Sequence, residues 1–345
     1  AHCLDGGQIR AMLYSFHLPL FFILNGITMR FRENENFGSY FTRKAKNYII
    51  PMFFLGIILL IVEGIQKQNH GQILSDTYML DGIVYLVEQK RAFPIWFVGA
   101  LFIADLLFYA VWKLGKNKLL PMSVISSLCL CLAIYLNLEY RRWLPWNFDV
   151  AIFGVFFIYF GYMFSHSSFT KIRDFVLQKR VISLFIGLVL MSIGLILAMI
   201  NFNKYNLHLE MWAMLYQKYY LVIPSAIISS FGFIFLCNSI SNKVLAELGK
   251  TTLFLLAFHQ IVSMTIFKDL FPEWYHNFCV SPKENINHYY FPLVETLFCL
   301  VTILPAYYLT INTPLCIFLN KKMPTWLQNI IKKIYSWIFS LKKQS

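Results

Sequence analysis

A histidine lies inside a strongly apolar stretch, Phe16-His17-Leu18-Pro19-Leu20-Phe21-Phe22-Ile23-Leu24-Asn25-Gly26. With its flanks this stretch is long enough to enter a lipid bilayer, where no water is present to hydrogen-bond an imidazole. Either His17 lies near the interface or bonds a neighbouring helix, or it faces a wet cavity where chemistry takes place. In the second interpretation the histidine could take part in catalysis, because an imidazole with a pKa of about 6.5 suits proton transfer at neutral pH.

A second histidine, His259, falls near the middle of another apolar run, where an ionisable group is a functional hypothesis by default. The alternative is a hydrogen bond to a neighbouring helix. Asp105 and Glu295 also lie inside apolar runs, and we assign them no role. Other histidines are interpreted as solvated loop residues: His70, His166, His208, His276 and His288.

Three further residues could contact a carbohydrate. Trp96 begins an apolar run and is either a substrate contact or an aromatic residue of the membrane interface. Asn147 and Asp149 follow Trp146 at the start of another run, and a carboxylate beside an aromatic ring suits sugar binding. Both are equally suited to capping the helix that begins there.

These residues are distributed over apolar segments that predict membrane-spanning helices. The 345 residues are 58% hydrophobic and only 14% charged, with a mean hydropathy of +0.57, whereas soluble domains carry about 25% charged residues. We therefore predict an all-α polytopic membrane protein with about nine transmembrane helices. The segments are 12–29, 48–65, 94–112, 119–137, 149–165, 181–200, 219–238, 252–270 and 291–311.

The distribution of basic residues predicts the orientation of these helices. Alternate connections carry 20 Lys and Arg on one side and 10 on the other, and the richer side is expected to be cytoplasmic. This places Ala1 outside the cell, so we expect the intact protein to have a further, preceding helix, ten in all, with both ends cytoplasmic.

The chain divides into a membrane domain, residues 1–323, and a tail, residues 324–345. In the tail, apolar residues alternate with lysines, which predicts a basic amphipathic helix lying on the anionic inner leaflet.

Composition also argues against several classes of site. The seven cysteines lie mostly in or beside apolar runs, without CxxC or Cys/His spacing, so we predict no metal site. The formal charge of +13 is typical of membrane topology signals, so we predict no nucleic-acid partner, while membrane lipids are expected partners.

Five segments, in chain order, resemble the acyltransferase-3 family, integral-membrane enzymes that O-acylate carbohydrates and related acceptors. The likeness covers residues 2–311, with departures at Asn25, where serine is usual, at Lys46, where arginine is usual, and in the missing first helix. The fourth segment is similar to the branch related to fucose 4-O-acetylases. The segments are Phe16–Gly26, Arg43–Pro51, Trp96–Phe102, Leu144–Asp149 and Leu248–His259.

The resemblance implies roles for individual residues. A family histidine that ends the first helix corresponds to His2, which would be the general base, with His17 as a second catalytic residue. The donor would be cytoplasmic acyl-CoA, with no metal required. Its phosphates could contact Arg43 and Lys46, although basic residues at an inner helix end are also ordinary topology signals. His259, like Trp96, Asn147 and Asp149, would bind substrate.

We therefore expect a bacterial plasma-membrane acyltransferase, C-terminus cytoplasmic, most simply an O-acetyltransferase using acetyl-CoA. Its acceptor would be a cell-surface carbohydrate or its lipid-linked precursor. The alternative is a transporter or exporter of a polysaccharide or glycolipid, because broken helices and intramembrane polar residues are also transporter features.

Overall fold

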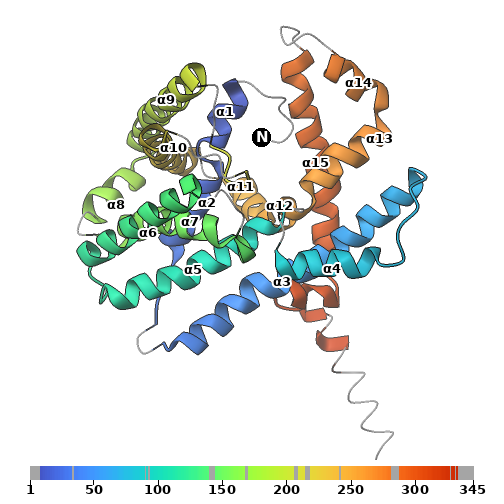
Figure 1. Ribbon diagram of the computed structural model, residues 1–345, viewed down its shortest axis with the longest axis horizontal. Helices are drawn as coiled ribbons and strands as arrows, with labels where there is room; N and C mark the ends of the chain where they lie inside the picture. The colour runs from blue at the N-terminus through green and yellow to red at the C-terminus, as the bar shows by residue number, and fades with distance from the viewer. Residues whose placement is uncertain are drawn as a thin grey trace, which may run out of the picture. The chain divides into compact units, whose positions relative to one another are not determined.

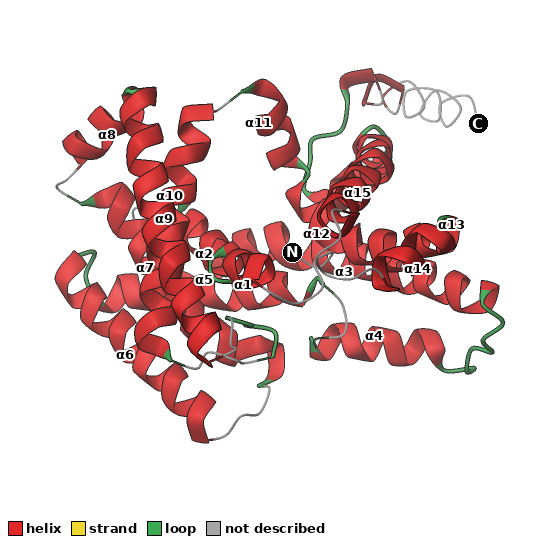
Figure 2. Ribbon diagram, turned by 90° about the horizontal axis from the view of Figure 1, so that it is seen from above, coloured by secondary structure: helices red, strands yellow, loops and turns green. Residues whose placement is uncertain are grey.

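The computed structural model describes residues 8–32, 35–89, 91, 94–139, 144–167, 170–205, 209–213, 218–240, 242–280, 287–326, 328–330 and 332. Across these ranges the chain is helical apart from turns and short connections (Figure 2). The same ranges contain nine helices long and apolar enough to cross a membrane, which confirms the predicted all-α polytopic fold. The chain forms two compact units: unit 1 (Ala1–Phe41 and Val87–Gly249) and unit 2 (Thr42–Leu86 and Lys250–Ser345).

Unit 1 is organised around α7, the most buried of its spans, which packs against α2, α5 and α6. A second pair, α9 and α10, lies side by side along most of its length (Figure 1). The spans of unit 1 are α1 (Gln8–Tyr14) continued by α2 (His17–Thr28), α5 (Trp96–Leu114), α6 (Leu119–Glu139), α7 (Phe148–His166), α9 (Arg180–Tyr205) and α10 (Tyr219–Ile240). Shorter elements are η1 (Pro145–Asn147), α8 (Thr170–Gln178) and α11 (Lys243–Lys250), whose last residue belongs to unit 2.

Two glycines bring the backbones of α2 and α7 into direct contact. A Cβ atom at Gly161 would overlap the carbonyl oxygen of Ile23, and one at Gly26 would overlap that of Ile158. Small residues at such crossings are the usual means of close helix approach in membranes, where packing rather than hydrophobic burial drives association. This contact fixes α2, the helix that begins at His17, against the most buried helix of the unit.

Unit 2 is built on two long helices. In it, α4 (Tyr78–Glu88) lies against α3 (Phe37–Asn69), with Leu86 over Gly56 and Leu60 over Gly82. The long helix α15 (Asn287–Ile311) packs against α12 (Thr252–Ile261) and the π-helical turn η2 (Val262–Phe267). The remaining elements are α13 (Lys268–Leu270), α14 (Pro272–Val280) and η3 (Pro314–Leu319).

The helix α3 is longer than the predicted 48–65 segment and begins in unit 1. Asn36 caps it, since its Oδ1 accepts the N–H of Ser39 at 2.8 Å. The added first turns include basic and other polar residues, which do not count toward an apolar run, and so the prediction began the helix too late.

The connections between the predicted spans also contain short helices, α4, α8, α11 and α14. His276 lies on α14, His288 lies on α15, and His166 ends α7 with its ring stacked on Tyr162 at 4.0 Å, so the loop interpretation of these three histidines was wrong. His208 lies outside the described residues. The predicted amphipathic tail falls mostly outside the described residues and stays a prediction.

Candidate active site

His17 is the first residue of α2, directly after a break at Ser15 and Phe16 that separates this helix from α1. Its Nδ1 lies 3.2 Å from the carbonyl oxygen of Leu13, and its ring centre lies 4.8 Å from that of Tyr14. Because a carbonyl oxygen only accepts, Nδ1 is the donor, and in the neutral ring the basic lone pair is on Nε2. The side chain is half-buried, and like any neutral imidazole it keeps one ring nitrogen that can accept a proton.

The other predicted catalytic residue, His2, lies outside the described residues, which begin at Gln8. Its role stays a prediction.

A buried ion pair that sequence reasoning missed joins three connections of unit 1. The guanidinium of Arg91 bonds the Asp149 carboxylate, and the two side chains are only 1% and 2% exposed. Arg91 Nε also donates to Asn147 Oδ1 at 2.8 Å, and its NH1 donates to the Trp212 carbonyl at 2.6 Å. The indole N–H of Trp212 in turn donates a hydrogen bond to the backbone carbonyl of Arg91 at 2.8 Å. This arrangement is the Arg91 network.

The Arg91 network contains three of the predicted substrate-binding residues. Asn147 Nδ2 donates to the carbonyl of Gln89 at 3.2 Å and to that of Trp96 at 3.3 Å, and the Arg91 guanidinium lies 5.6 Å from the Trp96 ring centre. Asn147 has a left-handed backbone (φ 53°), a conformation that asparagine tolerates better than most residues. The structure thus brings Trp96, Asn147 and Asp149 together through Arg91, with the side-chain polar groups of Asn147 and Asp149 bonded to protein atoms.

The second polar cluster of unit 1 lies between α2 and α5. Asn25 Nδ2 donates to the carboxylate of Asp105, which is fully buried within its span. The phenol of Tyr40, also fully buried, donates to the Asp105 carbonyl at 3.3 Å. Asn25 lies eight residues after His17 on α2, about 12 Å along the helix axis. A carboxylate buried in a membrane span marks a functional position by default.

The predicted CoA-binding residues, Arg43 and Lys46, lie on α3 in unit 2, three residues apart and so on one side of the helix. Arg43 is half-buried and Lys46 is exposed. Between them, the buried Lys44 places its ammonium 5.6 Å from the ring centre of Tyr48. The side of α3 that carries Arg43 and Lys46 therefore differs from the side on which Lys44 packs.

His259 lies on α12, two residues before its end, and is half-buried. Its Nδ1 is 3.0 Å from the carbonyl of Leu255 and 2.9 Å from that of Leu256, so Nδ1 donates back to its own helix. The Cys299 thiol donates to the His259 carbonyl at 3.7 Å, which ties α12 to α15. This histidine belongs to unit 2, whereas His17 belongs to unit 1.

The sequence profile of an acyltransferase domain, that of the acyltransferase-3 family, matches residues 3–311. The chain belongs to the acyltransferase-3 family. No curated protein and no solved structure matched it. The match covers most of the chain and agrees with the resemblance found in the five sequence segments, while the similarity to the fucose 4-O-acetylase branch stays a prediction.

As a member of the acyltransferase-3 family, the chain is a multi-pass membrane acyltransferase. Over the described part of this acyltransferase, no group of three or more His, Cys, Asp or Glu side chains could hold a metal ion. The candidate active-site groups of unit 1 are therefore the His17 imidazole, the Asn25–Asp105 pair and the Arg91 network.

Proposed function

We propose that this chain is an O-acetyltransferase that moves an acetyl group from cytoplasmic acetyl-CoA to a hydroxyl group of a cell-surface carbohydrate or its lipid-linked precursor. The family membership supports the acyl-transfer chemistry. The observation that carries the assignment to this site is the His17 imidazole, which donates through Nδ1 and so has Nε2 as its basic nitrogen. We further propose a bacterial plasma membrane as its location, with the C-terminus on the cytoplasmic side.

In the proposed reaction a histidine, His2 or His17, accepts the proton of the acceptor hydroxyl while the hydroxyl oxygen attacks the thioester carbonyl. The carbon–oxygen bond of the ester forms, the carbon–sulfur bond breaks, and the CoA thiolate takes up the proton. A positioned base of this kind contributes about 10²–10⁴-fold to the rate. On the cytoplasmic side, Arg43 and Lys46 would bind the phosphates of CoA.

The test compares two histidines with a similar backbone contact. The Nδ1 of His166 also lies near the carbonyl four residues before it, that of Tyr162 at 3.0 Å, and its ring also lies beside an aromatic ring, but His166 is at the opposite end of its span from the predicted outer face. With purified protein, labelled acetyl-CoA and candidate glycans, His17→Ala should lower acetyl transfer by about 10²–10⁴-fold. His166→Ala, the matched control, should leave transfer near the wild-type rate.

His2→Ala, measured in the same assay, should give a loss as large as that of His17→Ala or larger. If His2→Ala, His17→Ala and His166→Ala all lowered acetyl transfer by the same small factor, the losses would reflect packing alone. His2 and His17 would then not be catalytic residues.

Transport is the second candidate function. Among the described residues, three spans depart from a regular α-helix: Gln8–Thr28 at Ser15 and Phe16, Pro145–His166 at Trp146 and Asn147, and Thr252–Leu270 at its π-helical turn. Interrupted helices line binding sites in transporters. Movement of a glycan or glycolipid across proteoliposomes, with no release of CoA and no labelled ester, would favour the carrier over the enzyme.

A further inference from the structure

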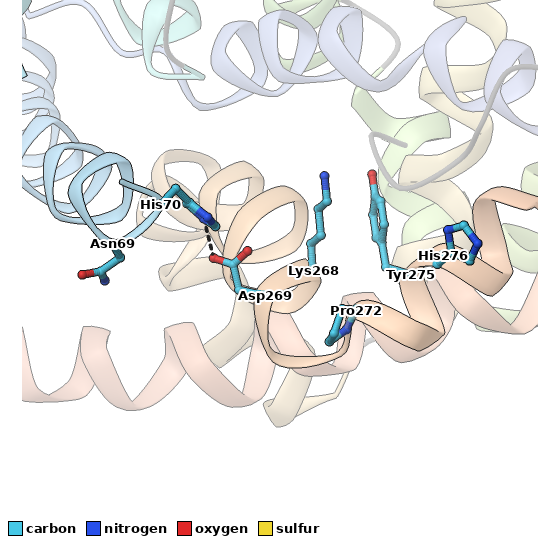
Figure 3. Close-up of a pocket in the computed structure, with 7 residues that line it drawn as sticks. All are labelled: Asn69, His70, Lys268, Asp269, Pro272, Tyr275 and His276. Carbon is cyan, nitrogen blue, oxygen red and sulfur yellow. Dashed lines mark hydrogen bonds and ion pairs between the residues drawn. The ribbon is translucent and has the colours of Figure 1, made fainter. Parts of the chain in front are cut away.

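Unit 2 contains a pocket of about 780 Å³ where the end of α3 meets α13 and α14 (Figure 3). Its lining includes His70 from the turn after α3, Lys268 and Asp269 from α13, and Tyr275 and His276 from α14. The volume lies within the range of about 300–1,000 Å³ that is usual for small-molecule sites. The charge distribution predicts that this end of the helices faces outward, the side from which a surface glycan would arrive.

One cation of this pocket has no carboxylate partner among the described residues. The Asp269 carboxylate lies against His70, with Oδ2 3.0 Å from Nε2, and the two form an ion pair only when the imidazole is protonated. In the described part of the chain the Lys268 ammonium contacts only the face of the Tyr275 ring, 5.3 Å from its centre, and has no carboxylate partner. The exposed imidazole of His276 adds another hydrogen-bonding group to the wall. The lining therefore combines an ammonium available to a ligand with an aromatic face.

The side chains of Lys268 and Tyr275 project in the same direction from their two helices, so the ammonium and the phenol reach the same part of the pocket (Figure 3). The helix that carries Lys268 is preceded by the six-residue π-helical turn Val262–Phe267 and is broken at Phe271 (φ −132°, ψ 58°). Such π-helical turns are rare and occur frequently at functional sites.

We propose that this pocket binds an anionic group of the glycan acceptor, a sugar carboxylate or a phosphate ester, with Lys268 as the cation and the ring of Tyr275 against the sugar. The assignment to an acceptor rests on the proposed function. An ammonium pairs with either anion as a point charge, so the shared chemistry is an oxyanion attached to a sugar.

The test measures binding apart from catalysis. Ligand-observed NMR with the full chain in lipid nanodiscs would compare glucuronate, glucose 1-phosphate and glucose. The wild type should bind at least one anionic probe about tenfold more tightly than glucose, a difference of about 1.4 kcal/mol. The anion that binds more tightly shows which kind of acceptor the pocket takes, because glucuronate represents an acidic sugar and glucose 1-phosphate represents a phosphorylated sugar.

Substitutions test whether the preference for the anionic probes comes from Lys268. Lys268→Ala should abolish the preference for the anions, and Lys268→Arg should keep it. Lys204→Ala is the matched control, because Lys204 is likewise exposed and likewise lies over a tyrosine ring, 5.4 Å from the centre of Tyr205, but in unit 1. It should leave the preference unchanged.

Three results would overturn the proposal: no binding of any probe, equal binding of the three probes by the wild type, or an anion preference that survives Lys268→Ala. Acetyl transfer, measured separately with labelled acetyl-CoA, distinguishes this failure from that of the proposed function. If the protein transfers acetyl groups but shows no preference for the anionic probes, the pocket assignment is wrong and the proposed function still stands. If the protein binds the anions through Lys268 but transfers no acetyl group to any acceptor, the proposed enzyme function is wrong and the anion site still stands.

Discussion

Arg91 and Asp149, 58 residues apart in the chain, form an ion pair that is almost completely removed from solvent. Each partner has further bonds: Arg91 reaches Asn147 and Trp212, and Asp149 Oδ1 accepts the backbone N–H of Leu144 at 3.4 Å. The pair therefore ties together the connections that precede α5 and α7 and the turn that contains Trp212. Because these connections precede two of the most buried spans of unit 1, the Arg91 network positions the first turns of α5 and α7.

Removing either charge should destabilise the protein strongly. Arg91→Ala or Asp149→Ala leaves the other charge buried without its partner, which costs about 3–5 kcal/mol. The double substitution Arg91→Met with Asp149→Leu should recover much of this loss, since no isolated charge remains. The thermal unfolding midpoint of the detergent-solubilised protein measures the effect. Asp174→Ala, which breaks the more exposed pair with Arg173, should change the midpoint little.

A purely structural role for Arg91 and Asp149 also has a kinetic signature. If both residues act only by holding the fold together, the double variant that restores stability should retain acetyl transfer with an unchanged KM for the acceptor. A raised acceptor KM in a stable double variant would show that the pair also takes part in acceptor binding.

The pair Asn25–Asp105 makes a second prediction. Asp105→Leu leaves the Asn25 amide without its carboxylate acceptor inside a buried contact, which costs about 1–3 kcal/mol. Asp105→Asn keeps an acceptor oxygen and should cost less. Thermal unfolding would rank the two, with Asp81→Leu on α4 as the control, since the bond of Asp81 with Thr77 is exposed. An equal midpoint for wild type and Asp105→Leu would show that the pair contributes nothing to stability.

The fold could be predicted from the sequence because its signal is local. A run of about 20 apolar residues has few alternatives to a membrane helix, so all nine spans of the described chain were found. The helix α4 was missed because its 11 residues are too short to span a membrane, and its apolar residues include Leu86, which packs against α3.

The candidate site could be predicted only in part, because pairing between distant residues leaves no local pattern. Asp105 was recognisable as an acid inside an apolar run, but its partner Asn25 precedes it by 80 residues. Arg91 lay among basic residues of a predicted outer connection, and nothing in its neighbourhood indicated that Asp149 would bury it. By contrast, His17 could be found from its own surroundings, since an imidazole inside an apolar stretch is unusual wherever it occurs.

The close contact of α2 with α7 predicts a strong effect of one added methyl group. Gly161→Ala places its Cβ against the Ile23 carbonyl, a backbone atom that cannot rotate away, and overpacking of this kind costs about 1–3 kcal/mol. The unfolding midpoint should fall, and acetyl transfer should fall with it because α2 carries His17. Gly249→Ala is the matched control, since its Cβ would meet nothing within 4 Å. If Gly161→Ala were as stable as Gly249→Ala, the two backbones would not be in direct contact.

The proposed CoA contact predicts different responses at Arg43 and Lys46. Arg43 is half-buried and its guanidinium can bond two phosphate oxygens, so Arg43→Ala should raise the KM for acetyl-CoA about tenfold or more, and Arg43→Lys should restore it only in part. Lys46 is exposed, so Lys46→Ala should raise KM a few-fold, and the effect should shrink as salt rises. Lys243→Ala, at an exposed lysine of α11 on the same predicted face, is the control. An unchanged KM in both variants would leave these residues as topology signals, because removing a side chain that binds the CoA phosphates must weaken donor binding.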